Sequence, residues 1–371
     1  MFIHNITKQL ILILLMGIQV LNAASGKIEI YAEVNQAVGN IAYTYKGELV
    51  YSNHPFYSPD IRVIHYNAKT KESTPYPNLE WNTPRESDDM WFDSVLGIRS
   101  DAKGIVWILD MGQREGLTPK LVGWNTHTNT LEKIYYIPEP ASIKTSQLND
   151  FIIDYRHGVF IIADEDIGYG GDGSKAALVI IDMKTGECRR ILEGHRTTKP
   201  EDVSIVVNGK SLNIPNTQKH IKVGVDGITA DKDNIWLYYA PLNGSKVYRV
   251  KIEDLLNKAS SEEQLDRQIE TYAAKSNNGG FSMDKENNLY LTYIESHSIG
   301  VISAKDKKSY HYVSDAMMSW PDGVSYNKDG YMYVAAAQLS NASVFNDGVD
   351  KTKKPFYIFR FKPLVEGIFG R

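Results

Sequence analysis

The stretch Asp322–Val334, which reads DGVSYNKDGYMYV, decides how this chain folds. An acidic residue and a glycine open a short apolar segment, a turn of Asn, Lys, Asp and Gly follows, and an aromatic-rich segment ends the stretch. Turn residues of this kind between two strand-like segments predict a β-hairpin. The same pattern occurs in five further stretches, Gly39–Tyr51, Leu96–Ile108, Asp150–Ile161, Asp226–Leu237 and Gly279–Leu291.

The spacing of these hairpins predicts the architecture. They start at positions 39, 96, 150, 226, 279 and 322. Repeats of roughly 40–50 residues or somewhat more, each with a few strands, are typical of β-propellers. We therefore expect an all-β fold, a six-bladed β-propeller. The last repeat supplies only three strands, and Lys27–Val34 alternates like a strand, so we expect this N-terminal strand to complete the last blade and close the ring.

Two segments interrupt the repeat. The first, Gly168–Ser174, is rich in glycine, but no Gly-Lys-Ser/Thr ending follows it, so it does not read as a phosphate-binding loop. We expect a mobile loop over the mouth of the channel. The second, Glu253–Ala274, predicts a helix on an outer edge, with Ser260 or Ser261 as its N-cap.

The N-terminus predicts export. Lys8 precedes the apolar run Leu10–Leu21, and small residues follow at positions 22–25, which is the order found in a cleavable signal peptide. We expect residues 1–24 to be removed and 25–371 to form a single six-bladed domain, in a secreted or periplasmic protein. Cys188 is the only cysteine, so no intramolecular disulfide can form.

Composition narrows the partners. The 371 residues carry a net charge of −4, and no basic run stands out, so no nucleic acid is expected as a partner. No other segment has the ~20 apolar residues of a membrane span, so no membrane contact is expected after cleavage. A small-molecule ligand is the expected partner, and the oligomeric state is left open.

A propeller gathers the starts of its inner strands at one mouth of the channel, and the second strands return there. Polar and aromatic residues are concentrated at these places. Those at or just before strand starts are Trp91, Asp93, Asn149, Asp150, Asp226, Asn278, Trp320 and Asp322. Those at strand returns are His54, Asp110, Asp164, Glu165, Tyr239, Glu295, His297 and Gln338.

Several neighbouring carboxylates cannot all ionise at low cost. Either a cation binds among them, or one has a raised pKa and can act as an acid or a base. For Asp226 and Asp322 a site and a simple turn role are equally consistent with the Asp-Gly pattern. His297 could pair with Glu295 and act as a general base. Four acids fall in the hairpin tips and predict turns only: Asp101, Asp231, Asp284 and Asp329.

In order and spacing, several short motifs together resemble the major royal jelly protein and yellow family, particularly its bacterial members. They are Val38-Gly39-Asn40-Ile41, Tyr76-Pro77-Asn78, Trp107–Gly112, Pro119–Val122, Gln147-Leu148-Asn149-Asp150, Asp226-Gly227-Ile228, Tyr238–Leu242, Trp320-Pro321-Asp322-Gly323 and Ala337-Gln338-Leu339. The resemblance covers nearly all of the chain after the signal peptide.

The resemblance implies an exported six-bladed propeller. Insect members include proteins linked to dopachrome conversion and others that bind small aromatic amines in the central cavity. By position, the cavity here would be lined by Asn149, Asp150, Asp226, Tyr239, Trp320, Asp322 and Gln338. The sequence departs from the family at Asp164-Glu165-Asp166, where a less acidic stretch is common.

The fold also looks like that of gluconolactonase and regucalcin-like propellers, which hold a divalent metal with a Glu on the first inner strand and Asn and Asp on later strands. Asn149, Asp226 and Asp322 could supply the later ligands. The first strand here reads Val38-Gly39-Asn40, with no Glu at the expected place. No cofactor is therefore favoured, although a divalent cation such as Ca²⁺ is kept as an alternative.

Three functional hypotheses follow. The first is a small-molecule-binding propeller with tautomerase or isomerase activity. Its base would be Asp150, Asp226 or Asp322, its proton donor Tyr239 or His297, and Trp91 and Trp320 would stack on an aromatic ligand. The second is a metal-dependent lactonase or similar hydrolase. The third is a non-enzymatic propeller that binds a protein partner.

Overall fold

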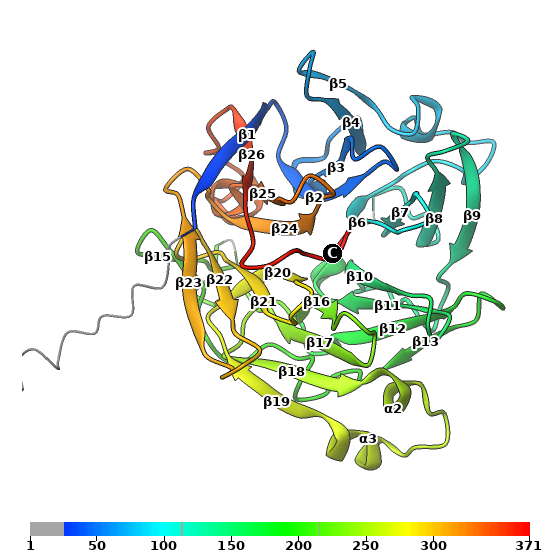
Figure 1. Ribbon diagram of the computed structural model, residues 1–371, viewed down its shortest axis with the longest axis vertical. Helices are drawn as coiled ribbons and strands as arrows, with labels where there is room; N and C mark the ends of the chain where they lie inside the picture. The colour runs from blue at the N-terminus through cyan, green and yellow to red at the C-terminus, as the bar shows by residue number, and fades with distance from the viewer. Residues whose placement is uncertain (1–25, 113, 215) are drawn as a thin grey trace, which may run out of the picture.

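Six sheets surround a central channel in the computed structural model, which describes residues 26–112, 114–214 and 216–371. Figure 1 shows the sheets arranged radially, like blades, around one axis. The predicted signal peptide, residues 1–24, lies outside the described residues. Each of the six hairpins expected from the sequence forms the two inner strands of one blade. The predicted six-bladed β-propeller is confirmed.

The first three blades are each built from four consecutive strands. Blade one contains β2 (Val38–Tyr43), β3 (Leu49–Asn53), β4 (Val63–Asn67) and β5 (Glu72–Pro75). Blade two contains β6 (Val95–Ser100), β7 (Ile105–Asp110), β8 (Lys120–Asn125) and β9 (Thr130–Tyr136). Blade three contains β10 (Leu148–Asp154), β11 (Val159–Asp164), β12 (Ala177–Asp182) and β13 (Cys188–Ile191).

Blades four and five are also built from consecutive strands, whereas blade six includes the N-terminal strand. Blade four contains β16 (Val225–Ala230), β17 (Trp236–Pro241), β18 (Lys246–Lys251) and β19 (Glu270–Ala274). Blade five contains β20 (Asn278–Met283), β21 (Leu289–Tyr293), β22 (Ser298–Ile302) and β23 (Ser309–Ser314). Blade six contains β24 (Pro321–Tyr326), β25 (Met332–Ala336), β26 (Phe356–Phe361) and the N-terminal β1 (Ile28–Val34). The predicted closure of the ring is confirmed, because β1 pairs antiparallel with β26.

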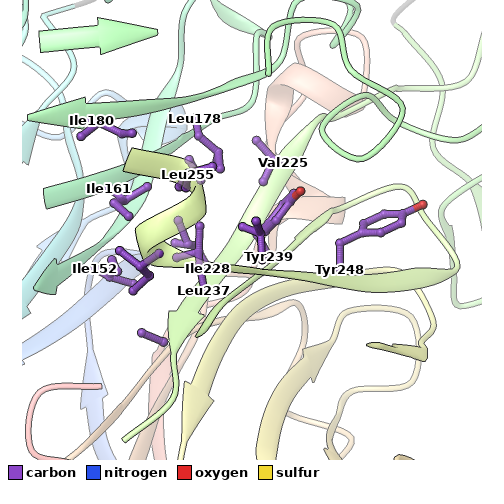
Figure 2. Close-up of a cluster of buried hydrophobic side chains, with 14 of the residues drawn as sticks. Ile152, Ile161, Leu178, Ile180, Val225, Ile228, Leu237, Tyr239, Tyr248 and Leu255 are labelled. Atoms are coloured by element: carbon purple, nitrogen blue, oxygen red, sulfur yellow. The ribbon is translucent and has the colours of Figure 1, made fainter. Parts of the chain in front are cut away.

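Hydrophobic side chains fill the spaces between neighbouring blades. Strand residues alternate between the two faces of a sheet, so each blade offers one apolar face to each neighbour. In β17, Leu237 and Tyr239 pack toward blade three, where Ile161 and Leu178 lie, whereas Tyr238 packs toward blade five. Figure 2 shows the cluster between blades three and four. A single blade could not bury both of its faces without these neighbours.

Short helices and one extra hairpin occupy the connections. The 3-10 helices are η1 (Pro55–Tyr57), η2 (Glu80–Asn82), η3 (Gly168–Gly170), η4 (Leu339–Asn341) and η5 (Ser343–Phe345). The connection between blades three and four also forms a small hairpin from β14 (Val206–Val207) and β15 (Lys210–Ser211). In the part of the chain that the structure describes, no helix has the length and apolar character needed to cross a bilayer.

The prediction of a helix over Glu253–Ala274 is confirmed in part and is wrong for the last residues of the stretch. The stretch forms two short helices, α2 (Ile252–Leu256) and α3 (Glu262–Gln268), and then the outer strand β19. Ser261 caps α3 through a capping box with Gln264, as the sequence suggested. The last residues become a strand because they pair with β18 and fill the outer position of blade four.

The last residues of the chain cross the end of the channel where the hairpin tips lie. The main-chain N–H of Gly370 donates to Tyr326 of blade six at 3.0 Å. The Arg371 guanidinium donates to the carbonyl oxygens of Ala230 at 2.9 Å and Asp231 at 2.7 Å in blade four. Figure 1 shows the C-terminus at the centre of the ring. These contacts tie two blades together across the channel.

Candidate functional site

A cavity of 690 Å³ opens at the other end of the channel, where the inner strands begin. Its polar lining includes His54, Gln147, Asn149, Glu165, Asp226 and Asp322. A loop of blade three adds Asp172, and the connection between blades three and four adds Asp202, Gln218, Lys219, His220 and Lys222. The apolar lining of the cavity includes Phe56, Leu96, Ile205, Trp320, Leu339 and Phe345. The structure thus brings together four residues singled out in the sequence as site candidates: Asn149, Asp226, Trp320 and Asp322.

Bulges at the starts of the inner strands present the acids to this cavity. The pairing register breaks near the first residues of all six inner strands, for example between Val225 and Gly227 and between Pro321 and Val324. A β-bulge takes a residue out of the ladder and re-aims its side chain. Asp226 and Asp322 occupy such positions, so their carboxyl groups reach the cavity instead of the packed faces of the blades.

Two glycines allow Asp322 to lie close to blade five. A Cβ atom on Gly280 would lie 2.7 Å from the main-chain oxygen of Asp322, and one on Gly279 would lie 2.9 Å from its Oδ1. Only a residue without a Cβ fits at such distances from its neighbours. The glycines therefore narrow the channel and bring the carboxyl group of Asp322 toward those of the other blades.

Glu165 and Asp226 hydrogen-bond to each other through their carboxyl groups. Each residue is only 3% exposed. Two carboxyl groups can share a hydrogen bond only when one of them carries a proton. Two amides hold Glu165 in place: Gln147 Nε2 donates to Oε2 at 2.6 Å, and Asn149 Nδ2 donates to Oε1 at 3.1 Å. The pair is thus a fixed, proton-sharing unit at the cavity surface.

Burial and mutual repulsion keep protons on this carboxyl cluster, which consists of Glu165, Asp226 and Asp322. Burial raises the pKa of Asp226 to about 7, and the charge of Asp150 adds to the rise. Burial, with the charge of Asp226, also raises the pKa of Glu165 well above its usual range. The pKa of Asp322 is raised by burial and then by Asp226 and Asp150. The cluster can therefore both donate and accept a proton near neutral pH.

His54 faces Asp322 as a neutral imidazole. The main-chain N–H of Phe56 donates to its Nδ1 at 3.2 Å, so the proton of the neutral ring lies on Nε2. Nε2 is 3.7 Å from Oδ2 of Asp322. Burial lowers the pKa of His54 to about 3, and the residue is 2% exposed. His54 therefore offers an N–H group, not a positive charge, to the cavity.

The walls of the cavity form an apolar cluster that includes the extra hairpin. Ile205, just before the hairpin, and Val207, in its strand β14, pack with Trp320 and Leu339. The ring of Trp320 stacks on Phe345 at 6.4 Å between centroids. Glu295 holds the hairpin in place, because its Oε1 accepts the main-chain N–H of Val206 at 2.6 Å. The cavity therefore combines an acidic floor with an aromatic and aliphatic wall, an arrangement suited to an amphipathic small molecule.

Comparison with known proteins decides the family. The sequence profile described as "Major royal jelly protein" matches residues 93–363, well over half of the chain. The chain belongs to the major royal jelly protein family. The resemblance stated from the sequence motifs is confirmed. No protein with a curated description matches the chain significantly in sequence.

Solved structures show the same fold as this major royal jelly family protein at low sequence identity. Regucalcin from Agrobacterium tumefaciens, described as a calcium-binding protein, has a TM-score of 0.58 at 10% identity, over 92% of this chain and 96% of that one. A luciferin-regenerating enzyme has 0.57 at 14%, over 93% and 98%. A gluconolactonase from Xanthomonas campestris has 0.53 at 10%, over 91% and 90%. Such low identities establish the fold alone.

The cavity of this family member does not have the donor arrangement of a metal centre. No group of three or more His, Cys, Asp and Glu among the described residues is placed to hold a metal ion. Glu165 and Asp226 bond to each other, and the amides of Gln147 and Asn149 turn N–H groups toward Glu165, where a cation would need oxygen atoms. The first inner strand begins Val38-Gly39-Asn40 and carries no acidic side chain there, and a Cβ on Gly39 would lie 2.6 Å from Leu96 Cδ1.

Two predicted residues face other parts of the interior. Asp150 follows Asn149 but forms a buried ion pair with Arg99, whose Nε donates to Oδ1 at 3.0 Å. Tyr239 lies in the core between blades three and four, and its hydroxyl contacts Thr197 Oγ1 at 2.9 Å. Figure 2 shows Tyr239 among Ile228, Leu237 and Val225. Neither residue lines the cavity.

Three further predicted residues hold loops. Trp91 Nε1 donates to the main-chain oxygens of Arg85 and Asp88, both at 3.1 Å. Gln338 exchanges two hydrogen bonds with the main chain of Lys353, at 2.8 and 3.0 Å. His297 contacts Asn208 Oδ1 through Nε2 at 3.1 Å, and no bond to Glu295 forms. None of the three lines the cavity.

Sequence reasoning undervalued three residues of the site. Glu165 and His54 were both expected at strand returns near the channel mouth, and Gln147 begins one of the family motifs, but none of the three was predicted as a catalytic or ligand-binding residue. The four tip acids do form turns, as predicted; Asp101 Oδ1, for example, accepts the N–H groups of Lys103 and Ile105.

Proposed function

We propose that this major royal jelly family protein binds a small amphipathic ligand, with an aromatic body and an amine, in the 690 Å³ cavity at the channel mouth. The observation that carries the proposal is the proton-sharing pair Glu165–Asp226 beneath an apolar wall. The aromatic body would pack against Trp320, Phe56 and Phe345, and the ammonium group would lie against the carboxyl cluster.

A bound ammonium group would replace a proton in the carboxyl cluster. A positive charge beside a buried carboxyl group favours its ionised form. Binding of an amine near neutral pH should therefore release a proton, whereas binding of an uncharged analogue should not. This signature separates recognition by the cluster from simple hydrophobic uptake.

The same cluster has the groups for an isomerisation, as in tautomerase chemistry. One carboxylate would accept a proton from one atom of the ligand, and a neighbouring carboxylic acid would return a proton to another atom. The ligand's double bond shifts, and no electrons are gained or lost overall. Such a reaction needs one ionised and one protonated carboxyl group beside the ligand. The pair formed by Glu165 and Asp226 would supply one group of each kind.

Calorimetry with matched ligands tests the proposal. We expect tryptamine or dopamine to bind and to release a proton, seen as a heat that depends on the buffer's ionisation enthalpy, while 2-(indol-3-yl)ethanol binds more weakly without proton release. Asp322→Asn and Asp226→Asn should weaken amine binding, and the hairpin-tip variant Asp329→Asn should not. Equal binding of the amine and the alcohol, or unchanged binding in both cluster variants, would remove the proposal.

We further propose that residues 1–24 direct export and are cleaved, because their charged, apolar and small-residue order is that of a signal peptide. Expression of the full chain followed by intact-mass measurement tests this. Cleavage predicts a mature protein that starts near Ser25 and is recovered outside the cytoplasm. A cytoplasmic protein that retains Met1 would contradict it.

A further inference from the structure

The imidazole of His54 is held in one orientation at the wall of the cavity. The residue follows β3 and precedes η1, and its main-chain N–H donates to the carbonyl oxygen of Ala37 at 2.8 Å. The main-chain N–H of Phe56 donates to Nδ1 of the ring at 3.2 Å. The rings of Phe56 and Tyr57 meet the imidazole edge-to-face, at 4.9 and 6.2 Å between centroids. The ring is therefore fixed by contacts on both its main chain and its side chain.

The Nε2–H group of His54 has no acceptor within the protein. Because Nδ1 uses its lone pair to accept from Phe56, the ring carries its proton on Nε2 alone. Nε2 lies 3.7 Å from Oδ2 of Asp322, which is beyond hydrogen-bond range, and no other group among the described residues accepts from it. Since the ring lines the cavity and Nε2 is not sealed inside the protein, this donor is left for whatever occupies the cavity.

The donor of His54 and the carboxyl group of Asp322 lie side by side, so they can bind two neighbouring groups of one ligand. An oxygen that accepts from Nε2 and an ammonium group that donates to Oδ2 would each lie about 3 Å from its partner. Since Nε2 and Oδ2 are 3.7 Å apart, the oxygen and the nitrogen of the ligand fit both partners when they are themselves close together. On adjacent carbon atoms in a staggered arrangement, oxygen and nitrogen lie about 3 Å apart.

The acceptor beside the amine should be uncharged. A carboxylate in that place, as in an amino acid, would adjoin the carboxyl group of Asp322, with Glu165 and Asp226 in the same cavity lining. Like charges at this distance disfavour each other, most of all where water is largely excluded. A hydroxyl oxygen can accept from Nε2 without adding a negative charge.

We propose that His54 is the specificity-determining residue of the cavity and selects aryl amino alcohols, in which a hydroxyl group is attached next to the carbon that bears the amine. The ammonium group lies against Asp322, the hydroxyl oxygen accepts the Nε2–H of His54, and the aromatic ring packs against the apolar wall that includes Trp320. This specificity rests on the proposed function, because it uses the same cavity and the same amine site, and it adds a group that the ligand must carry.

Calorimetry with three matched ligands tests this specificity. At pH 7 the wild type should bind 2-amino-1-phenylethanol about 3- to 10-fold more tightly than 2-phenylethylamine, which lacks only the hydroxyl group, because one hydrogen bond is gained. Phenylalanine, with a carboxylate beside the amine, should bind more weakly than the amino alcohol. His54→Phe keeps a ring without an N–H donor, so it should lose the preference for the hydroxyl group and still bind 2-phenylethylamine. His65→Gln is the matched control: His65 lies on β4 of the same blade, outside the cavity lining, and the variant should keep the preference.

The outcomes separate this specificity from the proposed function. Equal binding of the two amines by the wild type, tighter binding of phenylalanine, or an undiminished preference in His54→Phe would overturn the role of His54 and leave the proposed function standing. Binding of neither amine would contradict both. If His54→Phe does not fold, ¹⁵N NMR of the histidine-labelled wild type decides, with the ring assigned through the Phe56 N–H that bonds to it. The Nε2 signal should move further with 2-amino-1-phenylethanol than with 2-phenylethylamine, and equal shifts would overturn the role of His54.

Discussion

His54 Nε2 lies 3.7 Å from Oδ2 of Asp322, and the two groups meet without forming an ordinary ion pair. Burial lowers the pKa of His54 to about 3, so the imidazole stays neutral where a free histidine would take up a proton. The carboxyl group of Asp322 is itself kept from ionising by burial, which raises its pKa. Two groups that attract strongly in water therefore adjoin in their uncharged forms at the mouth of the propeller.

This neutral histidine should make the protein sensitive to acid. The unfolded chain binds a proton at His54 below pH 6.5, whereas the folded chain does so only near pH 3, so the free energy of unfolding falls as the pH drops between these values. Relative to His54→Gln, the wild type should lose about 2 kcal/mol between pH 6.5 and a pH of about 4.5. Urea unfolding at both pH values measures this, and parallel losses in the two proteins would contradict it.

The contribution of Asp226 to the free energy of unfolding should change with pH in the opposite direction. The residue's folded pKa of about 7 lies above the ordinary value of 3.8, so the folded state keeps a proton that the unfolded state has lost. The wild type is therefore stabilised relative to Asp226→Asn at low pH, and this advantage declines as the pH rises from about 4 to 7 and is gone above that range. The expected total change is a few kcal/mol. Urea unfolding of both proteins across this range checks the sign, and a difference that grows with pH would count against it.

Alanine substitutions at the neighbouring glycines Gly279 and Gly280 should affect ligand binding and protein stability to different extents. Gly279→Ala places a methyl group 2.9 Å from Oδ1 of Asp322, which is the movable end of a side chain, so we expect weaker amine binding with less than about 1 kcal/mol lost in stability. Gly280→Ala places the methyl 2.7 Å from a main-chain oxygen and should cost about 1–3 kcal/mol. Calorimetry and urea unfolding of both variants test this contrast. Unaltered binding in Gly279→Ala would show that the position of Asp322 is unimportant for the ligand.

Arg371 should contribute to stability from the far end of the channel. Its guanidinium bridges to Ala230 and Asp231 across the axis. Arg371→Ala should lower the free energy of unfolding by about 2–3 kcal/mol, because charge-assisted bonds to two carbonyl oxygens are lost. Amine affinity should stay the same, since Arg371 is not part of the cavity lining. A melting temperature equal to that of the wild type would refute the bridging role.

Divalent cations should neither bind nor activate the cavity. The carboxyl pair and the amide N–H groups around Glu165 compete with a cation for the same oxygens. Addition of Ca²⁺, Zn²⁺ or Mn²⁺ is expected to leave the melting temperature unchanged, and treatment with a chelator should have no effect on amine binding. Stoichiometric metal in the purified protein, or hydrolysis of a lactone on metal addition, would revive the lactonase alternative.

The repeated hairpins made most of the fold predictable, because each hairpin depends on residues close together in sequence. Turn residues such as Asp101 bind main-chain N–H groups within their own hairpin, so their role follows from local sequence. The outer strand β19 was taken for a helix because its identity depends on a partner strand. Helix-like composition could not reveal that pairing.

The site was predictable only in part, because facing directions depend on the pleat and its bulges. Tyr239 and Tyr238 are adjacent, and the pleat sends them toward blades three and five, so the position of Tyr239 at a strand return did not bring it to the cavity. Asp226 and Asp322 reach the cavity because bulges take them out of the ladder. Asp150 sits in a similar bulge, but Arg99 from blade two binds its carboxylate.

The amino-acid sequence by itself determined the six hairpins, their order around the ring and the strand that closes it, because these depend on short-range turn chemistry and on a regular repeat. Only the tertiary structure decided which acids meet. Glu165 comes from the end of β11 and Asp226 from the start of β16, with the connection that covers the cavity between them. Their shared proton arises because closing the ring buries both carboxyl groups at one point, where water no longer stabilises two charges.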